Sequence, residues 1–266
     1  MIKKIPTSQC NILHTLESGQ FFRYKNNGGT FRIIYKRNIF FVKQEDENIF
    51  FNHISREEIE NFFALNDNYT EQMNLISTDD HIANAARAYP GLRILNQDVW
   101  ECMIAFLCSS ASNIPRIKTT LENIAQVFGE EKKGEYLFPQ VGEIDSFKKI
   151  VDCKAGYRAR FIYEVNNSVT KSFLAKLKKK SYEDAKADLV ELPGIGEKIA
   201  DCILLFSCHK LNAFPVDVWI ERLMKQNYFP RKKVSMTEIR IFAQKRFYPY
   251  AGYAQQFLYH WGRNQK

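Results

Sequence analysis

Three short runs rich in aromatic and β-branched residues lie near the N-terminus, with Asn/Gly turn residues between the first two, a pattern typical of β-hairpins. Ser55 and Glu58 then form a capping-box pattern ahead of an apolar helix face that begins at Ile59. We therefore expect an antiparallel sheet backed by one helix over roughly the first 65 residues. The three runs are Gln20-Phe-Phe-Arg-Tyr, Thr30-Phe-Arg-Ile-Ile-Tyr and Ile39-Phe-Phe-Val, with Asn-Asn-Gly-Gly between the first two.

From about residue 70 the apolar spacing changes to three and four residues, which predicts helices. Short turns separate these stretches, and the chain has no internal repeat, so we expect one array of eight to ten helices. The predicted fold is α+β and mostly α, with a sheet domain over residues 1–70 and a helical domain over residues 71–266. The apolar positions include Trp100, Met103, Ile104, Leu107, Ile117, Leu121, Ile124, Phe128, Phe161, Val165 and Val169.

Residues 182–207 have the pattern of two helices joined by a glycine turn, a helix-hairpin-helix. The turn is Leu192-Pro-Gly-Ile-Gly196. We expect Gly194 and Gly196 to adopt φ values that other residues avoid, and the free amides at the start of the second helix to bind a phosphate oxygen. Such a contact recognises the DNA backbone and not its sequence. The same turn could also join two helices in a protein of any function.

The chain has 266 residues and a net charge of +8, which is unevenly distributed. Residues 1–90 hold 10 Lys and Arg against 11 Asp and Glu, whereas the remainder holds 28 against 19. This asymmetry favours a polyanionic partner such as nucleic acid, although a merely soluble basic surface would also explain it. No apolar run approaches the ~20 residues that a membrane span needs, and the start lacks a secretory segment. We expect no membrane partner.

The six cysteines are scattered without a Cys-x-x-Cys pair, and the five histidines do not fall at metal-ligand spacing. In a non-exported chain such cysteines are read as free, mostly buried thiols. We expect neither a disulfide framework nor a metal site.

Lys198 lies in the first turn of the second hairpin helix, where the positive end of the helix dipole disfavours a cation by ~0.3 to 1 kcal/mol. The same field, with partial burial, favours an uncharged amine, which is the form that a nucleophile needs. Cys202 lies four residues further on and shares this helix face. The alternative is a surface lysine that pairs with Asp201 while Cys202 fills the core.

Asp217 stands between the extended segment Phe214-Pro-Val and an amphipathic stretch. An N-cap worth ~1 kcal/mol would by itself explain an aspartate there. The functional interpretation adds that a carboxylate near a reactive lysine stabilises positive charge on a sugar ring, as the carboxylates of glycosidases do. The two interpretations are compatible, because a capping aspartate is held rigidly.

The hairpin and the Phe214-Pro-Val-Asp segment resemble the helix-hairpin-helix and Gly/Pro-Asp loop of base-excision DNA glycosylases, and most closely the 8-oxoguanine DNA glycosylases. The resemblance covers most of the chain and implies that Lys198 is the Schiff-base lysine and Asp217 the catalytic aspartate. Further motifs follow in the family's order: Ser18-Gly-Gln-Phe, Asn96-Gln-Asp, Glu101-Cys, Cys108-Ser-Ser, Gly156-Tyr-Arg-Ala-Arg and Pro249-Tyr-Ala-Gly-Tyr-Ala-Gln255.

The resemblance also implies a pocket for the flipped base. The carbonyl oxygen of Gly19 would accept a hydrogen bond from the N7 hydrogen that 8-oxoguanine has and guanine lacks. Gln255 would read the pairing edge of the base, while Tyr259 and Cys202 would contact its two faces. Gln255 and Tyr259, four residues apart, would share a helix face in any case.

Three further residues match family positions that contact the DNA around the lesion. Tyr157 matches the wedge that fills the emptied stack, and Arg116 and Arg158 match the arginines that read the estranged cytosine. Two positions depart from the family pattern, because Ala111 stands where the family has an asparagine and Trp219 where it has a phosphate-binding histidine. These departures bear on opposite-base discrimination and on the contact with the backbone.

The resemblance implies a bifunctional DNA repair enzyme that excises 8-oxoguanine from duplex DNA through Lys198 and nicks the strand by β-elimination, as a monomer without a cofactor or metal. It implies a cytoplasmic location, at the nucleoid in a prokaryote, or a nuclear one in a eukaryote. No Cys follows Cys208, so the iron–sulfur motif of the endonuclease III branch is absent. The rivals are a glycosylase for alkylated or other damaged bases without lyase activity and a non-catalytic DNA-binding protein.

Overall fold

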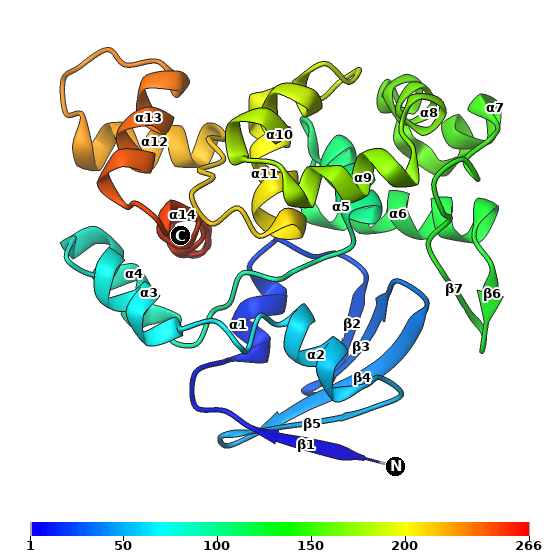
Figure 1. Cartoon of the computed structure of the whole chain (residues 1–266), viewed down its shortest axis with the longest axis horizontal. Coiled ribbons are helices and arrows are strands. Elements are labelled where there is room, and N and C mark those ends of the chain that lie inside the picture. The colour runs from blue at the N-terminus through cyan, green and yellow to red at the C-terminus, as the bar shows by residue number, and fades with distance from the viewer. Residues whose placement is uncertain (1, 266) are drawn as a thin grey trace.

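The N-terminal part of the protein is an antiparallel sheet covered by two helices (Figure 1). The computed structural model describes residues 2–265, and the sheet has the strand order β1-β5-β4-β3-β2. Apolar side chains of the strands and of both helices form one core, which includes Leu16, Phe40 and Phe62. The elements are β1 (Lys3–Pro6), α1 (Ile12–Glu17), β2 (Tyr24–Asn27), β3 (Thr30–Tyr35), β4 (Asn38–Glu45), β5 (Asn48–Asn52) and α2 (Arg56–Phe62).

Most of the predicted sheet is confirmed, including the turn at Gly28 and Gly29, whose φ values are +60° and +87°. Ser55 and Glu58 form the capping box at the start of α2. The prediction of a strand is wrong for residues 20–23, because β2 begins only at Tyr24 and the four residues before it are all buried in a loop, on both sides of the chain. β1 and α1 were not predicted.

The rest of the described chain is almost wholly helical, apart from a two-stranded hairpin, β6 (Glu131–Lys132) and β7 (Glu135–Tyr136). It holds twelve α-helices, more than the eight to ten predicted, because capping residues such as Asn68 and Asp79 begin short helices that have no long apolar stripe. The helices are α3 (Tyr69–Ile76), α4 (Asp80–Ala88), α5 (Val99–Ser109), α6 (Ile114–Phe128), α7 (Phe147–Ile150), α8 (Arg158–Ser168), α9 (Lys171–Lys179), α10 (Tyr182–Val190), α11 (Glu197–Cys208), α12 (Val218–Tyr228), α13 (Met236–Arg246) and α14 (Ala251–Asn264), with a π-helical turn (Val151–Ala155) before α8.

The helical core is built around α5 and α11, which pack against each other near the centre of the helical array in Figure 1. Their apolar residues are buried along almost the whole length of each helix, as in a helix that is surrounded by others. Phe106 of α5 stacks on Phe206 of α11 with ring centroids 5.4 Å apart. The buried pair therefore holds the start of α11, where Lys198 lies, at a defined place.

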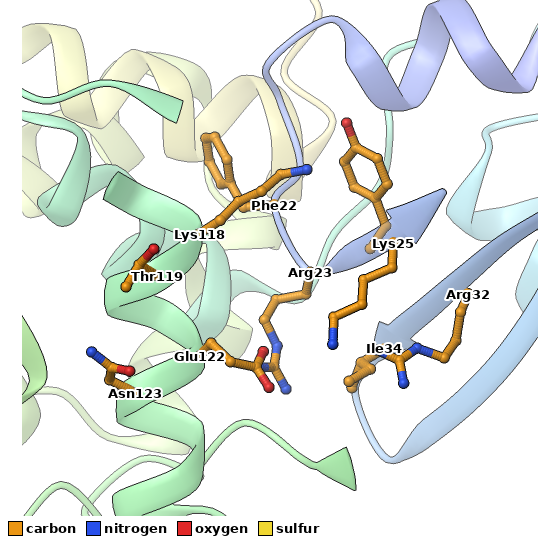
Figure 2. A pocket seen from close by; sticks show the side chains of 10 residues that line it. Phe22, Arg23, Lys25, Arg32, Ile34, Lys118, Thr119, Glu122 and Asn123 are labelled. Atoms are coloured by element: carbon orange, nitrogen blue, oxygen red, sulfur yellow. The ribbon is translucent and has the colours of Figure 1, made fainter. Parts of the chain in front are cut away.

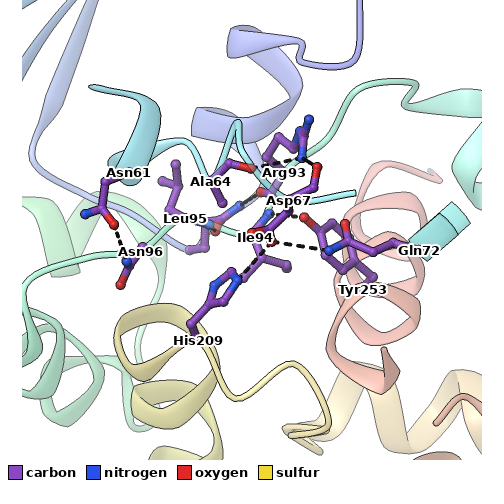
Figure 3. A network of polar contacts seen from close by, with 11 residues as sticks. Asn61, Ala64, Asp67, Gln72, Arg93, Ile94, Leu95, Asn96, His209 and Tyr253 are labelled. Carbon is purple, nitrogen blue, oxygen red and sulfur yellow. Dashed lines mark hydrogen bonds and ion pairs between the residues drawn. The ribbon is translucent and has the colours of Figure 1, made fainter. Parts of the chain in front are cut away.

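A polar network joins the sheet part of the protein to the end of α11 (Figure 3). Arg93 is fully buried and donates to the carbonyl oxygens of Gln9, at 2.8 Å, and Ala64, at 3.0 Å. Asp67 accepts from Nε2 of His209, the left-handed residue that ends α11, at 2.9 Å. Burial would raise the pKa of the Asp67 carboxyl, but its hydrogen bond with His209 and the charges of His209 and Arg93 hold that pKa below its ordinary value.

Candidate active site

The helix-hairpin-helix forms as predicted, with α10 and α11 joined by the turn at residues 191–196. Gly194 has a φ of +76°, and a Cβ there would lie 2.4 Å from the ring of Phe161, so only glycine fits. The same expectation for Gly196 is wrong, because its φ of −85° is open to any residue. A Cβ on Gly196 would meet nothing within 4 Å, so the start of α11 is open to an approaching group.

Asp201 does not pair with Lys198, which excludes that alternative. The fully buried carboxylate of Asp201 accepts from Tyr182 at 2.6 Å and lies 2.9 Å from Nζ of Lys186. Both partners belong to α10, so this contact ties the two helices of the hairpin together. Burial raises the pKa of the Asp201 carboxyl, and the charge of Lys186 opposes that rise.

Lys198 is partly buried and forms no ion pair with any residue of the described chain. Its Nζ donates to Oγ of Ser109, at the end of α5, at 3.2 Å. The same nitrogen lies 5.5 Å from the ring centroid of Phe106. A neutral hydroxyl and an aromatic ring therefore hold the amine, and no carboxylate of residues 2–265 pairs with it. Sequence reasoning did not single out Ser109, although it lies in the Cys108-Ser-Ser motif.

Cys202 is buried one turn after Lys198, as predicted from their spacing. Burial raises the pKa of its thiol to about 12, with the charge of Lys198 lowering that value and the charge of Asp217 raising it. The thiol is therefore neutral at physiological pH and presents an uncharged surface. Lys198 lies on the same helix as Cys202, Asp217 begins the next helix, and the charges of both act on this one side chain.

Asp217 is the N-cap of α12, as predicted. Its Oδ1 accepts from the backbone amides of Trp219, at 3.1 Å, and Ile220, at 2.8 Å. Within residues 2–265, its second oxygen has no hydrogen-bond donor. The cap thus uses one oxygen and leaves the other, with its share of the negative charge, available to a substrate. Trp219, where the family has a histidine, is 45 % exposed.

Gly19 lies in a loop that two glutamine side chains hold in place. Nε2 of Gln20 donates to the carbonyl oxygens of Thr15, at 3.2 Å, and Arg93, at 2.8 Å. Nε2 of Gln256 on α14 donates to the carbonyl oxygen of Ser18 at 2.9 Å. With a φ of +83°, Gly19 adopts a conformation that suits glycine. Sequence reasoning did not assign Gln20 or Gln256, although a glutamine within an apolar run is a signal for such a role.

Gln255 and Tyr259 lie on one face of α14, as predicted. Gln255 is buried, and its Oε1 has no hydrogen-bond partner within residues 2–265, which is unusual for a buried polar atom outside a binding site. Cε1 of Tyr259 lies 3.2 Å from the place of a Cβ on Gly19. Burial raises the pKa of the Tyr259 hydroxyl, and the charge of Asp217 raises it further while that of Lys198 lowers it. The structure thus groups Gly19 and Tyr259 with Lys198, Asp217 and Cys202.

Arg116, Tyr157 and Arg158 form a second group, around Gly156. Tyr157 is 59 % exposed, and the guanidinium of Arg158 lies over its ring at 4.5 Å. Arg158 itself is buried and donates to the carbonyl oxygens of Ser110, Ala111 and Ala155. Arg116 is exposed. Arg158 therefore supports the local structure, whereas Arg116 is the more available of the two cations.

The end of α5 connects the two groups. Ser109 accepts from Lys198, and the next two carbonyl oxygens accept from Arg158. Ala111 has a φ of +45°, which is uncommon for a residue other than glycine, asparagine or aspartate. An asparagine, the residue that the family has here, would adopt this conformation at a lower cost.

We expect Ala111→Asn to raise the free energy of unfolding by up to about 1 kcal/mol, because it relieves a left-handed alanine. Thermal unfolding measures the change, and Ala111→Gly is the control, since it relieves the same strain without adding a side chain. A lower melting temperature for both variants would contradict this account.

A further cavity lies between the sheet and α6, and it contains none of the predicted site residues (Figure 2). It has a volume of about 300 Å³. Arg23 pairs with Glu122 across it, and Arg32 pairs with Glu135. Nζ of Lys118 lies 3.6 Å from the ring centroid of Tyr24. Acidic partners therefore neutralise both arginines.

All six cysteines are free and buried, as predicted. Within residues 2–265, no three His, Cys, Asp or Glu side chains come together in a way that could hold a metal ion. Among the helices of the same residues, none has the length and apolar character that a membrane crossing needs.

Comparison with known proteins identifies relatives along the whole chain. The family model for the 8-oxoguanine DNA glycosylase N-terminal domain matches residues 3–103. The probable N-glycosylase/DNA lyase of Methanothermobacter thermautotrophicus is 29 % identical, over 78 % of this chain and 75 % of that protein. The structure of the Clostridium acetobutylicum 8-oxoguanine glycosylase/lyase with DNA that contains cytosine opposite 8-oxoG is 29 % identical, with a TM-score of 0.91 over 99 % of this chain and 97 % of that one.

A second solved structure, that of MBOgg1 in complex with a low-affinity DNA ligand, has a TM-score of 0.93. The two sequences are 30 % identical, and the match covers 98 % of this chain and 95 % of that one. The sequence motifs, the hairpin with its partly buried lysine, and these similarities agree, and the chain belongs to the 8-oxoguanine DNA glycosylase family.

Proposed function

We propose that this protein is a bifunctional DNA repair enzyme that excises 8-oxoguanine from duplex DNA and then cleaves the strand. The observation that carries the proposal is the amine of Lys198, which is partly buried at the start of α11, unpaired with any carboxylate of the described chain, and held by Ser109. Relatives named as N-glycosylase/DNA lyase or as 8-oxoguanine glycosylase/lyase support the substrate and both reactions.

In the proposed reaction, Nζ of Lys198 attacks C1′ of the nucleotide while the base leaves with the electrons of the glycosidic bond. Positive charge develops on the sugar ring, and the free oxygen of Asp217 stabilises it. Opening of the sugar ring then gives an imine between Lys198 and C1′. The imine makes the C2′ proton acidic, and loss of that proton expels the 3′ phosphate by β-elimination.

We assign the base pocket to Gly19, Cys202, Gln255 and Tyr259. The carbonyl oxygen of Gly19 accepts from N7–H of the base, and Gln255, whose Oε1 has no partner within residues 2–265, reads its pairing edge. Tyr259 and the neutral thiol of Cys202 cover the two faces. Extrusion of the base costs a few kcal/mol, which the contacts to the bent duplex offset.

We assign the contacts around the lesion to the hairpin and to the group around Gly156. Gly196 lets the DNA backbone approach the free amides of α11, and the left-handed turn at Gly194 positions this start of the helix at the DNA. The exposed ring of Tyr157 fills the emptied stack, and Arg116 with Arg158 reads the estranged cytosine. We place the enzyme as a monomer with the DNA that it repairs, at the nucleoid in a prokaryote or in the nucleus of a eukaryote.

Borohydride reduction during incubation with an 8-oxoguanine duplex tests the proposed function. Reduction of the imine leaves an irreversible link between protein and DNA, so we expect a shifted band that requires the lesion. Base release without any linked product would overturn the lyase role and favour a glycosylase that uses water alone. Binding without base release would favour the non-catalytic rival.

Replacing both Arg116 and Arg158 by Ala should flatten the preference for cytosine over adenine opposite the lesion. Each well-formed contact between arginine and base is worth roughly 1 to 3 kcal/mol. Because Ala111 replaces the family's asparagine, we expect the starting preference to be weaker than in relatives. Excision rates from four duplexes that differ only in the opposite base measure the effect.

Arg116→Ala alone is the cleaner variant, because Arg158 also supports the end of α5 and its loss lowers stability. Arg87→Ala, an exposed arginine on α4, is the matched control and should leave the preference unchanged. A double variant that kept a strong cytosine preference would show that other residues read the opposite base.

A further inference from the structure

Three polar side chains follow one another along a single face of α14. Gln255, Tyr259 and Arg263 are spaced four residues apart, so their side chains form a stripe about 12 Å long. The proposed function uses the first two of them. Arg263 lies at the end of the stripe away from Gln255, beside Gly19.

The guanidinium of Arg263 is only partly satisfied. Its Nη2 donates to the carbonyl oxygen of Glu17 at 2.6 Å. Its Nη1 is buried and has no hydrogen-bond partner within residues 2–265. The same Nη1 lies 2.8 Å from the place of a Cβ on Gly19. A buried charged donor without an acceptor is unfavourable in a folded protein, so this nitrogen suits a site where a ligand supplies the acceptor.

The three side chains follow one another in the order in which the parts of a bound purine would meet them. A base whose pairing edge meets Gln255 and whose face lies on Tyr259 directs its five-membered ring towards Gly19 and Arg263. That end of 8-oxoguanine carries two polar groups, the N7–H donor and the C8 oxygen acceptor. The carbonyl oxygen of Gly19 accepts from N7–H, which leaves the C8 oxygen without a partner from the residues assigned above.

We propose that Arg263 donates a hydrogen bond to the C8 oxygen of the flipped base and so reads the oxidised atom itself. This inference rests on the proposed function. A cavity of about 380 Å³ is lined in part by Gly19 and Arg263, so the guanidinium borders free space and can change its rotamer. Together, Gly19 and Arg263 would recognise both groups that oxidation adds to guanine.

A purely structural role for Arg263 gives a different expectation. Its guanidinium lies 5.5 Å from the ring centroid of Tyr259, close enough for a cation–π contact that holds the ring in place. Loss of that support would weaken the excision of every base that stacks on Tyr259 by the same factor. Loss of a contact to the C8 oxygen would weaken only the excision of bases that carry an oxygen there.

The test compares 8-oxoguanine with 8-thioguanine, which keeps N7–H but carries a sulfur, a weaker acceptor, at C8. We expect the wild-type kcat/KM for 8-thioguanine to be about tenfold or more below that for 8-oxoguanine. Any part of this ratio that comes from the size of sulfur should be the same in wild type and variants. In Arg263→Met the two kcat/KM values should become much closer, because the C8 oxygen of 8-oxoguanine loses the guanidinium that donates to it. Arg263→Lys, which keeps a donor, should restore part of the ratio.

Two controls separate the possible failures. Asn264→Ala removes a neighbour that lines the same cavity and donates to Tyr89, and it should leave the ratio unchanged. Arg263→Met should also form the borohydride-trapped link normally at a preformed abasic site, where there is no base to read. Equal ratios in wild type and Arg263→Met would overturn the role of Arg263 alone. A wild-type protein that does not release 8-oxoguanine would overturn the proposed function as well.

Discussion

Lys198→Gln should bind lesion DNA but neither release the base nor form a borohydride-trapped link. One amine serves as nucleophile and as imine nitrogen, so its loss removes both steps at once. We expect the rate of base release to fall by at least about 10³-fold. Gel-shift binding, base release and trapping on the same 8-oxoguanine duplex measure the three properties.

The variant is expected to fold normally. Within residues 2–265, Lys198 makes no ion pair, and its Nζ donates to Oγ of Ser109. Removing a cation from the first turn of a helix also relieves an unfavourable interaction with the helix dipole. Lys225→Gln is the control, because Lys225 lies on α12 in an ordinary surface pair with Glu221. Normal trapping of Lys198→Gln would show that another amine is the nucleophile.

Asp217→Asn should lower kcat by about 10²- to 10³-fold while DNA affinity changes little. The carboxylate acts on charge that develops only in the transition state, so the ground-state complex does not depend on it. The substitution is informative because the cap uses only Oδ1, and an asparagine side chain offers the same acceptor. Single-turnover kinetics at saturating enzyme measure the step directly.

A second capping aspartate provides the control. Asp98 caps α5 by accepting from the backbone amide of Glu101 at 3.0 Å, so Asp98→Asn makes the same chemical change at another helix start. It should leave the single-turnover rate close to that of wild type. Near-normal turnover of Asp217→Asn would leave Asp217 with its structural role alone.

The sequence by itself determined the features that depend on neighbours a few residues away. The capping box at Ser55, the cap at Asp217 and the two helices within residues 182–207 were predicted and are present. Each of these rests on hydrogen bonds or apolar contacts within three or four residues, which a linear pattern records directly. The shared face of Gln255 and Tyr259 has the same origin.

The tertiary structure decided which distant group each side chain meets. Lys198 contacts Ser109, 89 positions earlier, and the nearby Asp201 turns instead to α10. Arg158 donates to carbonyl oxygens at the end of α5, and Arg263 covers Gly19. A helix pattern states which side chains share a face but not what lies opposite, because packing of the whole chain sets that choice. The local chemistry was therefore predictable, whereas which of these side chains come near one another depended on how the helices pack, with α5 against α11 and α12 against α14.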